Sequence, residues 1–432
     1  MSVLYSDTDE YDISAVLGKG TFGEVMKCWK RTSGHYVAIK ILKNYHLWKG
    51  VIKCELKILR TLKSVDSDKF CIVHFLESFT DDSKLCLVFE LLEQSLYEYQ
   101  KQQKFVPLPI RHIRSITKQV LIALQKLKEL AIVHTDIKPE NIMLVEKAQF
   151  PFKVKLIDFG SACFLPDIQQ IKGPYIQSRF YRSPEILLAL PFSEKVDMWS
   201  LGCVMAELHL GFPIYPGTNE YDQIRYITET QGLPSDRLLE TARKTHHFFK
   251  KVYQPNSTYQ WRLKSVNEYQ AETMVKPLET RAKILNSLDQ LATNSTKTTF
   301  PDKELKAELF DQLTMVRLIK KILTFDPRQR ISARAALKHP FISMRKLKSK
   351  YKITKYYNVA ALAISVAVTP SKNADGQFHC CQIFKESWNL ENEQYKSDHT
   401  LQKPRAIEQQ TADDLDDSGM EEFEKELNPQ KS

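Results

Sequence analysis

Several features that define common protein classes are missing from this chain of 432 residues. Its eight cysteines are scattered singly apart from Cys380 and Cys381, and no C-x-x-C spacing occurs, so free thiols are favoured over a disulfide framework or a zinc site. A long apolar run is also missing, because the stretch from Val359 to Val368 is far shorter than the ~18 residues that a membrane span needs. The first residues, MSVLYSDTDEYDIS, are acidic and polar and predict no secretory signal. We therefore expect a soluble globular protein with reduced cysteines and no contact with a membrane.

The positive charge of the chain is spread unevenly. The net charge is +10, yet the stretch from Thr411 to Ser432 holds eight acidic and two basic residues, so the rest is more basic than the total suggests. Such a surplus suits nucleic acid, an anionic substrate or acidic segments of a partner. No interleaving of aromatic and basic residues and no recognition-helix pattern occurs, so direct binding of nucleic acid is not expected.

Strand-like and helical patterns occupy different parts of the chain. From residue 11 to about 95, turns separate the strand-like runs YDISAVLG, GEVMKCWKR, HYVAIKIL and LCLVFELL. Among them, VIKCELKILRTL places Ile52, Leu56 and Leu59 at helical spacing. From about Pro109 onward helical periodicity dominates, as in IRSITKQVLIALQKLKEL and VDMWSLGCVMAELHLG. The predicted fold class is α+β, with a small β-rich lobe, a larger helical lobe and a ligand-binding cleft between them.

Changes in composition indicate where the segments begin and end. Polar residues accumulate from about 246 to 305, which predicts an insertion packed on the larger lobe. The last part of the chain begins with the basic run RKLKSKYK and ends acidic, so we expect it to be largely disordered. The predicted segments are an N-terminal piece over 1–10, one domain over 11–341 with lobes over 11–92 and 93–341, and a tail over 342–432.

A glycine-rich turn and a strand lysine suggest a phosphate site. Gly18, Gly20 and Gly23 form G-x-G-x-x-G between two strand-like runs, whereas a dinucleotide-binding turn would open a helix. Glycines in a hairpin let main-chain N–H groups approach phosphates without interference from a Cβ. The run VAIK then places Lys40 in an apolar strand, where a charged lysine needs an anion. Glu55 faces the buried side of its helix and can supply that anion. The Lys40–Glu55 pair is then either structural or orients Lys40 toward nucleotide phosphates.

The segment HTDIKPEN, from His134 to Asn141, supplies groups suited to phosphoryl transfer. Asp136 can accept a hydroxyl proton, Lys138 can neutralise a transferring phosphoryl group, and Asn141 can ligate a divalent metal. His134 is expected to pack and to orient the loop. The run VKLIDFG follows, and its Asp158 can bind a magnesium ion that bridges phosphates. Phosphoryl transfer requires mainly positioning and charge neutralisation, and this set can provide both.

In this order and spacing, the motifs resemble those of a eukaryotic protein kinase over residues 11 to 341. The loop KPEN is similar to the serine/threonine class, and PYIQSRFYRSPE resembles the group of cyclin-dependent, MAP and dual-specificity tyrosine-regulated kinases. The stretches CWKR, VAIKILKN, VFELLEQSLYE and EYDQIRYITETQGLP resemble homeodomain-interacting protein kinases. MAELHLG and a domain that starts near residue 11 are similar to a short-tailed member of that family. The homeodomain-interacting region of larger relatives has no counterpart here, so homeodomain partners are not predicted.

The resemblance implies an ATP- and Mg²⁺-dependent enzyme that phosphorylates serine and threonine residues of proteins. It implies catalytic roles for Asp136, Lys138, Lys40 and Glu55, and metal ligation by Asn141 and Asp158. Nucleotide contacts are implied for the glycine-rich turn, the adenine pocket and the segment joining the lobes, namely Leu17, Gly18, Lys19, Gly20, Thr21, Phe22, Gly23, Glu24, Val25, Ala38, Lys40, Glu90, Leu92 and Met143. Phe89 falls at the gatekeeper position. A buried Glu185–Arg330 ion pair and a brace of the catalytic loop by Asp197 are also implied.

One position departs from the common kinase pattern. Thr135 stands where many kinases have an arginine that grips a phosphorylated activation segment, and threonine has neither the charge nor the reach for this. Arg179 and Arg182 follow Tyr175 in PYIQSRFYR, and the resemblance implies that the enzyme phosphorylates this tyrosine itself. The resemblance also implies that Arg182 turns a neighbouring main-chain carbonyl away, which leaves a pocket that favours proline directly after the target residue, since proline has no N–H to satisfy.

Two rival functions are weighed against this interpretation. A pseudokinase would lack an equivalent of Lys40, Asp136, Asn141 or Asp158, and all four are present. A small-molecule kinase is disfavoured because the peptide-binding segment RFYRSPE is intact. We expect a monomer in the cytoplasm, with the nucleus as the alternative because RKLKSKYK is either a nuclear import signal or a solvated basic face.

Overall fold

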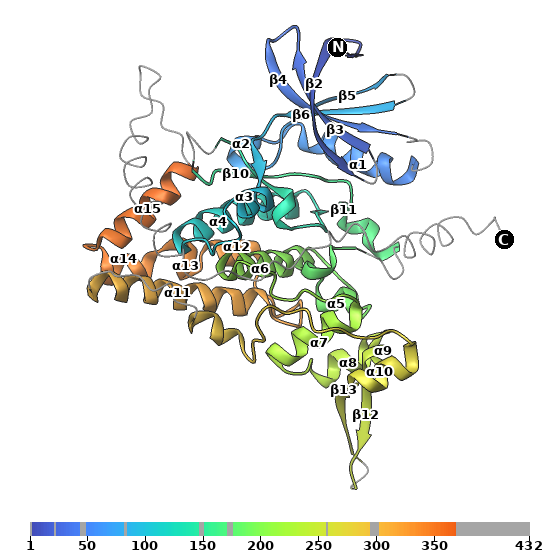
Figure 1. The fold of residues 1–432 in the computed structure, drawn as a ribbon, viewed down its shortest axis with the longest axis vertical. Coiled ribbons are helices and arrows are strands. Elements are labelled where there is room, and N and C mark those ends of the chain that lie inside the picture. The colour runs from blue at the N-terminus through green and yellow to red at the C-terminus, as the bar shows by residue number, and fades with distance from the viewer. Residues whose placement is uncertain are drawn as a thin grey trace, which may run out of the picture. The chain divides into compact units, whose positions relative to one another are not determined.

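The structure, a computed structural model, describes residues 2–20, 23–43, 49–81, 84–146, 151–170, 176–255, 258–293 and 302–368. The first part of the chain forms one antiparallel sheet with the strand order β1-β2-β3-β4-β6-β5 (Figure 1). Its strands are β1 (Val3–Tyr5), β2 (Glu10–Gly20), β3 (Gly23–Lys30), β4 (His35–Leu42), β5 (Phe75–Asp81) and β6 (Lys84–Glu90). The four strand-like runs of the sequence are therefore confirmed, and the turn at Gly34 has the positive φ of 62° that glycine adopts easily.

The sheet is built from strands whose side chains alternate between two faces. On β4, Val37, Ile39 and Ile41 are buried in a core that also includes residues of β3, β5 and β6. Because successive side chains of a strand point to opposite faces, Ala38 and Lys40 lie on the other face. This alternation places Lys40 on the side of the sheet away from that core.

Helix α1 (Lys49–Leu62) is the main helix of the small lobe, as predicted. Ile58, Leu59 and Leu62 are buried, whereas Lys53 and Arg60 are exposed. This helix is amphipathic, and its apolar side fixes its rotation, which in turn aims Glu55 inward. The short helix α2 (Ser67–Phe70) follows it.

The second part of the chain is mainly helical, which confirms the predicted α+β class. Helix α6 (Lys195–Leu210) is buried along every residue but its first and forms the centre of this lobe (Figure 1). Helices α4 (Ile110–Glu129) and α11 (Asp302–Ile322) pack on it. The other helices are α3 (Leu96–Gln102), α5 (Pro184–Leu187), α7 (Glu220–Gln231), α8 (Asp236–Thr241), α9 (Thr245–Phe248), α10 (Val266–Thr273), α12 (Ala333–Leu337) and α13 (Pro340–Ser343).

Two small sheets lie where the lobes meet. One has the order β10-β9-β7, and the other pairs β11 with β8. Their strands are β7 (Gln94–Ser95), β8 (Ile132–Val133), β9 (Ile142–Leu144), β10 (Val154–Leu156) and β11 (Cys163–Phe164). Short 3₁₀ helices are Pro139–Asn141, Leu165–Gln170, Arg179–Tyr181 and Leu288–Thr293. These short strands hold the HTDIKPEN and IDFG segments beside each other.

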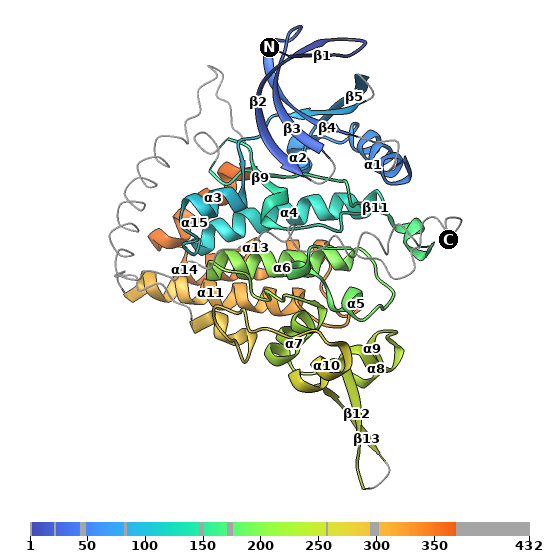
Figure 2. The same ribbon diagram turned by 45° about the vertical axis from the view of Figure 1, so that its right-hand side comes forward.

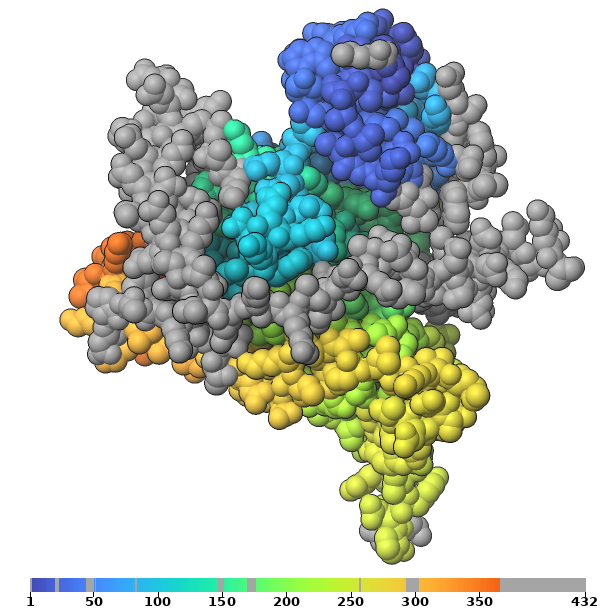
Figure 3. Space-filling model, in the orientation of Figure 1, coloured from blue at the N-terminus to red at the C-terminus, as the bar shows by residue number. Residues whose placement is uncertain are grey.

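The predicted insertion includes a two-stranded hairpin, β12 (Phe249–Tyr253) and β13 (Tyr259–Leu263). It projects as a finger away from the helices (Figures 2 and 3). Its base is anchored, because Trp261 is buried, while Tyr253 near its end is 72% exposed. Residues 256–257 and 294–301 of the predicted insertion are outside the described part of the chain, and its last residues begin helix α11.

Two helices occupy the start of the tail that was predicted over residues 342–432. Helices α14 (Arg345–Tyr351) and α15 (Lys355–Val368) pack against α4 and α11, with Leu347 and Ala360 buried in a common core. The apolar run that ends in α15 therefore covers the larger lobe, and residues 369–432 lie outside the described part. None of the helices in the described ranges combines the length and the apolar character needed to cross a membrane.

Candidate active site

An ion-paired lysine links the two lobes at the cleft. Lys40 on β4 places its ammonium 3.0 Å from Oε1 of Glu55 on α1 and 3.1 Å from Oδ1 of Asp158. Glu55 is buried, whereas the Asp158 side chain is 45% exposed. Lys40 and Glu55 therefore form the pair that the sequence predicted, with Asp158 as a second anionic partner open to the cleft.

The surroundings set the protonation of this cluster. Burial acts to lower the pKa of Lys40, but the carboxylates of Asp158 and Glu55 outweigh it and hold that pKa above its usual range. Burial likewise acts to raise the pKa of Asp158, while the Lys40 ammonium and the N–H of Gly160 bring it below its usual value. Lysine and aspartate are thus both charged at neutral pH, as phosphate and metal binding require.

Asp136 is held by groups on both sides of its carboxylate. Its Oδ2 accepts from the side-chain nitrogen of Asn141 at 2.9 Å and lies 3.1 Å from the Lys138 ammonium. Its Oδ1 accepts from the hydroxyl of Ser178 at 2.7 Å, and Lys138 also donates to that hydroxyl at 3.1 Å. Asp136, Lys138 and Asn141 are therefore brought together as predicted, and Ser178 joins them from a distant segment.

The loop that carries Asp136 is fixed from beneath. The N–H groups of His134 and Thr135 donate to the two carboxylate oxygens of Asp197, each at 2.8 Å. Nδ1 of His134 accepts from the N–H of Asp136, so its Nε2 carries the proton and donates to the carbonyl of Ile157 at 2.9 Å. His134 therefore positions the loop, and Asp197 braces it, as expected.

Thr135 has a different partner from the arginine that many kinases have at this position. Its hydroxyl donates to the carbonyl of Ser161 at 2.7 Å, while its backbone adopts a φ of 66°. Ser161 follows Asp158 by three residues, so this bond ties the loop to the start of the next segment. The contact is neutral and lies within the chain.

The glycine-rich turn is a hairpin between β2 and β3. Gly20 pairs with Gly23, and a Cβ placed on Gly23 would lie only 1.9 Å from the carbonyl oxygen of Ile41. Glycine is therefore required at this position by the neighbouring strand. Thr21 and Phe22, for which nucleotide contacts were predicted, lie outside the described residues.

Among the remaining predicted nucleotide residues, Val25 and Ala38 share the side of the sheet that carries Lys40. Ala38 pairs with Phe89 and Val25 with Lys40, while Met143 lies on β9 in the larger lobe. Within the described chain, the N–H of Leu92 has no main-chain acceptor, so it can donate to the edge of a base. Leu17, Gly18, Lys19 and Glu24 belong to the same hairpin.

A buried salt bridge supports the segment joining the lobes. Lys155 on β10 is 2% exposed and places its ammonium 2.8 Å from both carboxylate oxygens of Glu90. The ammonium also lies 3.0 Å from Asp68, and Glu90 accepts from the N–H of His74. The side chain of Glu90 therefore faces away from the nucleotide. The predicted contact of Glu90 with the nucleotide would have to be made by its main chain.

The donor set fits a magnesium ion held jointly with phosphates. Among the described residues, no group of three or more His, Cys, Asp or Glu side chains could hold a metal alone. Asn141 directs its Nδ2 to Asp136, which leaves its Oδ1 for a ligand, and Asp158 contributes an exposed carboxylate. Mg²⁺ is commonly bound through one or two protein oxygens together with substrate phosphates and water. These residues would hold the metal if ATP supplied the other oxygens.

The segment from Gln177 to Glu185 is anchored at both ends. Glu185 and Arg330 form a two-pronged ion pair at 2.6 and 2.8 Å, and both side chains are fully buried. Arg182 donates to the carbonyl of Gln177 at 3.0 and 3.2 Å, and Gln177 has a φ of 68°. The ion pair was predicted, and the carbonyl held by Arg182 is the one that the sequence expected to be turned away.

Arg179 and Arg182, which follow Tyr175 in the sequence, both donate to main-chain carbonyls in the described chain. Arg182 is 1% exposed and committed to Gln177 and to Glu220, whose carboxylate lies 3.4 Å away. Arg179 is only partly buried and donates to the carbonyl of Thr218 at 2.7 Å. Tyr175 itself lies outside the described residues.

Three residues of the site were not singled out in the sequence. Ser178 contacts Asp136 and Lys138, Gln177 supplies the carbonyl that Arg182 holds, and Lys155 pairs with Glu90. Ser178 and Gln177 stand within PYIQSRFYRSPE, which could be recognised as a motif although the roles of these two residues could not be predicted. The burial of Lys155 could not be predicted, because a lysine in the strand-like run VKLIDFG is expected to be exposed.

The fold and this arrangement define the class of the protein. A family model for the protein kinase domain matches residues 11–342. Protein kinase domains use ATP together with a divalent metal.

Relatives at higher identity narrow the assignment. Homeodomain-interacting protein kinase 4 of Homo sapiens is 51% identical over 436 residues, covering 98% of this chain and 71% of the relative. The Mus musculus protein of that name is 58% identical over 365 residues, and homeodomain-interacting protein kinase 2 of Mesocricetus auratus is 47% identical over 346 residues. These matches cover 83% and 80% of this chain, and 59% and 29% of the two relatives' lengths. The chain therefore belongs to the protein kinase family and, within it, to the homeodomain-interacting protein kinases.

Proposed function

We propose that this protein transfers the γ-phosphate of ATP to serine and threonine hydroxyls of other proteins. The observation that carries the proposal is the placement of the Asp136 carboxylate between Lys138, Asn141 and Ser178. ATP with Mg²⁺ supplies the phosphoryl group when it is bound. The function of the chain is then to position the acceptor hydroxyl and to compensate charge.

Each side chain has a distinct task in this proposal. Asp136 accepts the proton of the acceptor hydroxyl, and Lys138 compensates the charge that develops beside it. Lys40, oriented by Glu55, aligns the phosphates, while Asn141 and Asp158 hold the metal. The Asp197 brace keeps the loop in place without reorganisation during the reaction.

Replacing Asp136 by asparagine tests the proposal. Asp136→Asn should abolish transfer to a protein substrate while nucleotide binding stays nearly intact, because the carboxylate contributes little to the grip on ATP. Transfer is measured with labelled ATP, and binding by calorimetry on the same preparation. Wild-type turnover in Asp136→Asn would refute the assignment, and a wild-type protein that binds ATP but transfers nothing would identify a pseudokinase.

A second pair of substitutions separates a structural ion pair from one that orients Lys40. Lys40→Met should lose most activity, because the lysine ammonium aligns the phosphates. Glu55→Gln should lose less, because its amide still accepts from Lys40 at the observed 3.0 Å. Equal loss in the two variants would contradict the orienting role.

We also propose that substrates carry proline directly after the phosphorylated residue. Arg182 ties down the carbonyl of Gln177, which removes the acceptor that an N–H of the following substrate residue would otherwise use. Proline has no N–H and therefore loses nothing there. A positional peptide library should show this preference, and a flat profile at that position would reject it.

Tyr175 is the third part of the proposal, as a site of autophosphorylation. A phosphate there would add about −2 charge near Arg179, which is partly exposed, and could order the segment by charge-assisted hydrogen bonds. We expect Tyr175→Phe to reduce kcat about tenfold, equivalent to about 1.4 kcal/mol. Mass spectrometry of protein made in bacteria, with Asp136→Asn as control, decides the matter. Unmodified Tyr175 in active enzyme, or modified Tyr175 in the control, would exclude autophosphorylation.

A further inference from the structure

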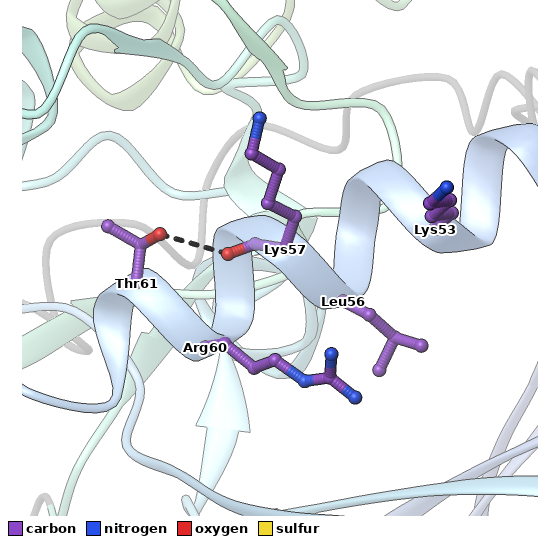
Figure 4. Close-up of a pocket in the computed structure, with 5 residues that line it drawn as sticks. All are labelled: Lys53, Leu56, Lys57, Arg60 and Thr61. Atoms are coloured by element: carbon purple, nitrogen blue, oxygen red, sulfur yellow. Dashed lines mark hydrogen bonds between the residues drawn. The ribbon is translucent and has the colours of Figure 1, made fainter.

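A shallow hollow of about 470 Å³ lies on the outer side of helix α1. Five side chains from this one helix line it, and they project from successive turns (Figure 4): Lys53, Leu56, Lys57, Arg60 and Thr61. Three of the five are cationic, one is apolar, and none is acidic. The proposed chemistry at Asp136 uses none of them.

The hollow and the ion pair occupy opposite sides of the same helix. Successive residues of an α-helix are rotated by about 100°, so Lys53, Lys57 and Arg60 project roughly opposite to Glu55. Glu55 is 5% exposed, whereas all three cations are exposed. Leu56 lies between these two sides and remains partly exposed. A molecule bound in the hollow would therefore touch α1 without entering the cleft.

The cations of the hollow are not neutralised by the described chain. Some other cations of the small lobe have carboxylate partners, such as Lys43 with Glu24 at 3.0 Å. Among the described residues, no carboxylate forms a salt bridge with Lys53, Lys57 or Arg60. The Lys57 ammonium instead lies 4.6 Å from the centre of the Phe164 ring.

The positive charges on this face destabilise helix α1 when no anion is bound to them. Lys53 and Lys57 are four residues apart, and like charges at that spacing destabilise a helix. The sole acidic residue of α1 is Glu55, which is directed to Lys40 and offers no compensation. An external anion would relieve this repulsion.

We propose that the outer face of α1 binds an extended, acidic segment of a partner protein. Lys53 and Arg60 are separated by about 10 Å along the helix at a rise of 1.5 Å per residue, too far for one phosphate or carboxylate to contact both. In an extended peptide, alternate side chains are roughly 6.6 Å apart, close to the ~6 Å between Lys53 and Lys57. Acidic residues at alternate positions would thus meet successive cations, and an apolar residue beside them would cover Leu56.

Two other anionic partners fit this face less well. Single-stranded nucleic acid is held by aromatic side chains on which bases stack, and the lining contains none. A membrane surface is bound through an apolar face inserted below the headgroups, whereas Leu56 is the only apolar lining residue. A peptide matches the length, the charge and the single apolar contact.

The binding test uses the full chain and a fluorescein-labelled peptide in which glutamate alternates with leucine and serine. Fluorescence polarisation should show saturable binding that weakens as salt increases, because exposed charges are screened. The same peptide with glutamine in place of glutamate should bind at least tenfold more weakly. Equal binding of the two peptides would overturn the proposal.

Matched variants locate the binding to this face. The combined change Lys53→Glu, Lys57→Glu and Arg60→Glu should weaken binding at least tenfold. The control reverses three exposed cations elsewhere, Arg334→Glu, Lys338→Glu and Lys346→Glu, and should bind within twofold of wild type. Equal loss in both sets would show only a response to net charge and would reject the site, as would wild-type affinity in the first set.

Further arms keep the test decisive if the charge-reversed protein folds poorly. Lys53→Gln with Lys57→Gln and Arg60→Gln removes the charges without reversing them, and thermal unfolding verifies its folding. Single-stranded DNA and phosphatidylserine vesicles are measured on the same variants. Tighter binding of either at this face than of the peptide would overturn the choice of partner. No ATP is present in any arm, so failure here is distinguishable from failure of the proposed transfer reaction.

Discussion

Removing the hydroxyl of Ser178 is expected to slow catalysis while leaving ATP binding unchanged. This hydroxyl donates to Asp136 at 2.7 Å and accepts from Lys138 at 3.1 Å, so it joins the two side chains proposed to act on the substrate. Hydrogen bonds to charged groups contribute about 1.5–3 kcal/mol. At about 1.4 kcal/mol per factor of ten, Ser178→Ala should lower kcat roughly 10- to 100-fold. Asp136 keeps its bond to Asn141, so loss of all activity is not expected.

The assay is steady-state phosphorylation of a protein substrate with ATP varied, on protein whose thermal unfolding matches wild type. Ser178→Thr retains a hydroxyl on the same Cβ and should recover most of kcat. The ATP KM should be unchanged in both variants, because Ser178 contacts neither Lys40 nor the glycine-rich turn. Wild-type kcat in Ser178→Ala, or an effect confined to the ATP KM, would refute this account of the site.

Three further predictions concern stability. Burial raises the pKa of Glu207 to about 8, so the folded state keeps a proton that the unfolded chain loses from about pH 4.5 upward. The contribution of Glu207 to the free energy of unfolding therefore falls as the pH rises from about 4.5 to about 8. Glu207→Gln cannot ionise, and its Tm relative to wild type should therefore be higher at pH 8 than at pH 5; the same difference at both would contradict the shifted pKa. Lys155→Met leaves Glu90 without its main cationic partner and should cost about 3 kcal/mol in denaturant unfolding, most of it regained by adding Glu90→Leu. Ala360→Asp buries a charge in the core shared by α14 and α15 and should lower Tm by several degrees, whereas Ser365→Asp on the exposed side should not; equal Tm values would show that α15 adds nothing to the fold.

In the predictable parts of the site, the reactive groups lie close together in the sequence, within the strand or loop that presents them. The strand VAIK and the loop HTDIKPEN each present their groups within a few residues, so Lys40, Asp136 and Asn141 could be assigned from local pattern. The Lys40–Glu55 pair was also accessible, because the helix periodicity fixes which side of α1 faces inward.

Contacts between distant segments were less accessible. The bond from Ser178 to Asp136 joins residues 42 apart, and nothing local distinguishes Ser178 from other serines. The burial of Lys155 depends on Glu90, which is 65 residues away. Helix α15 was missed for a related reason: its apolar run is short and follows a basic stretch, and it is the surface of α4 and α11 that it covers.

The hydroxyl bond from Thr135 to Ser161 has a consequence for how such an enzyme can be controlled. A neutral bond between a side chain and the main chain is little affected by ionic strength, since screening acts on charges. It also offers no group that a phosphatase could remove. Neither a change in salt concentration nor the removal of a phosphate is therefore expected to loosen the loop at this contact.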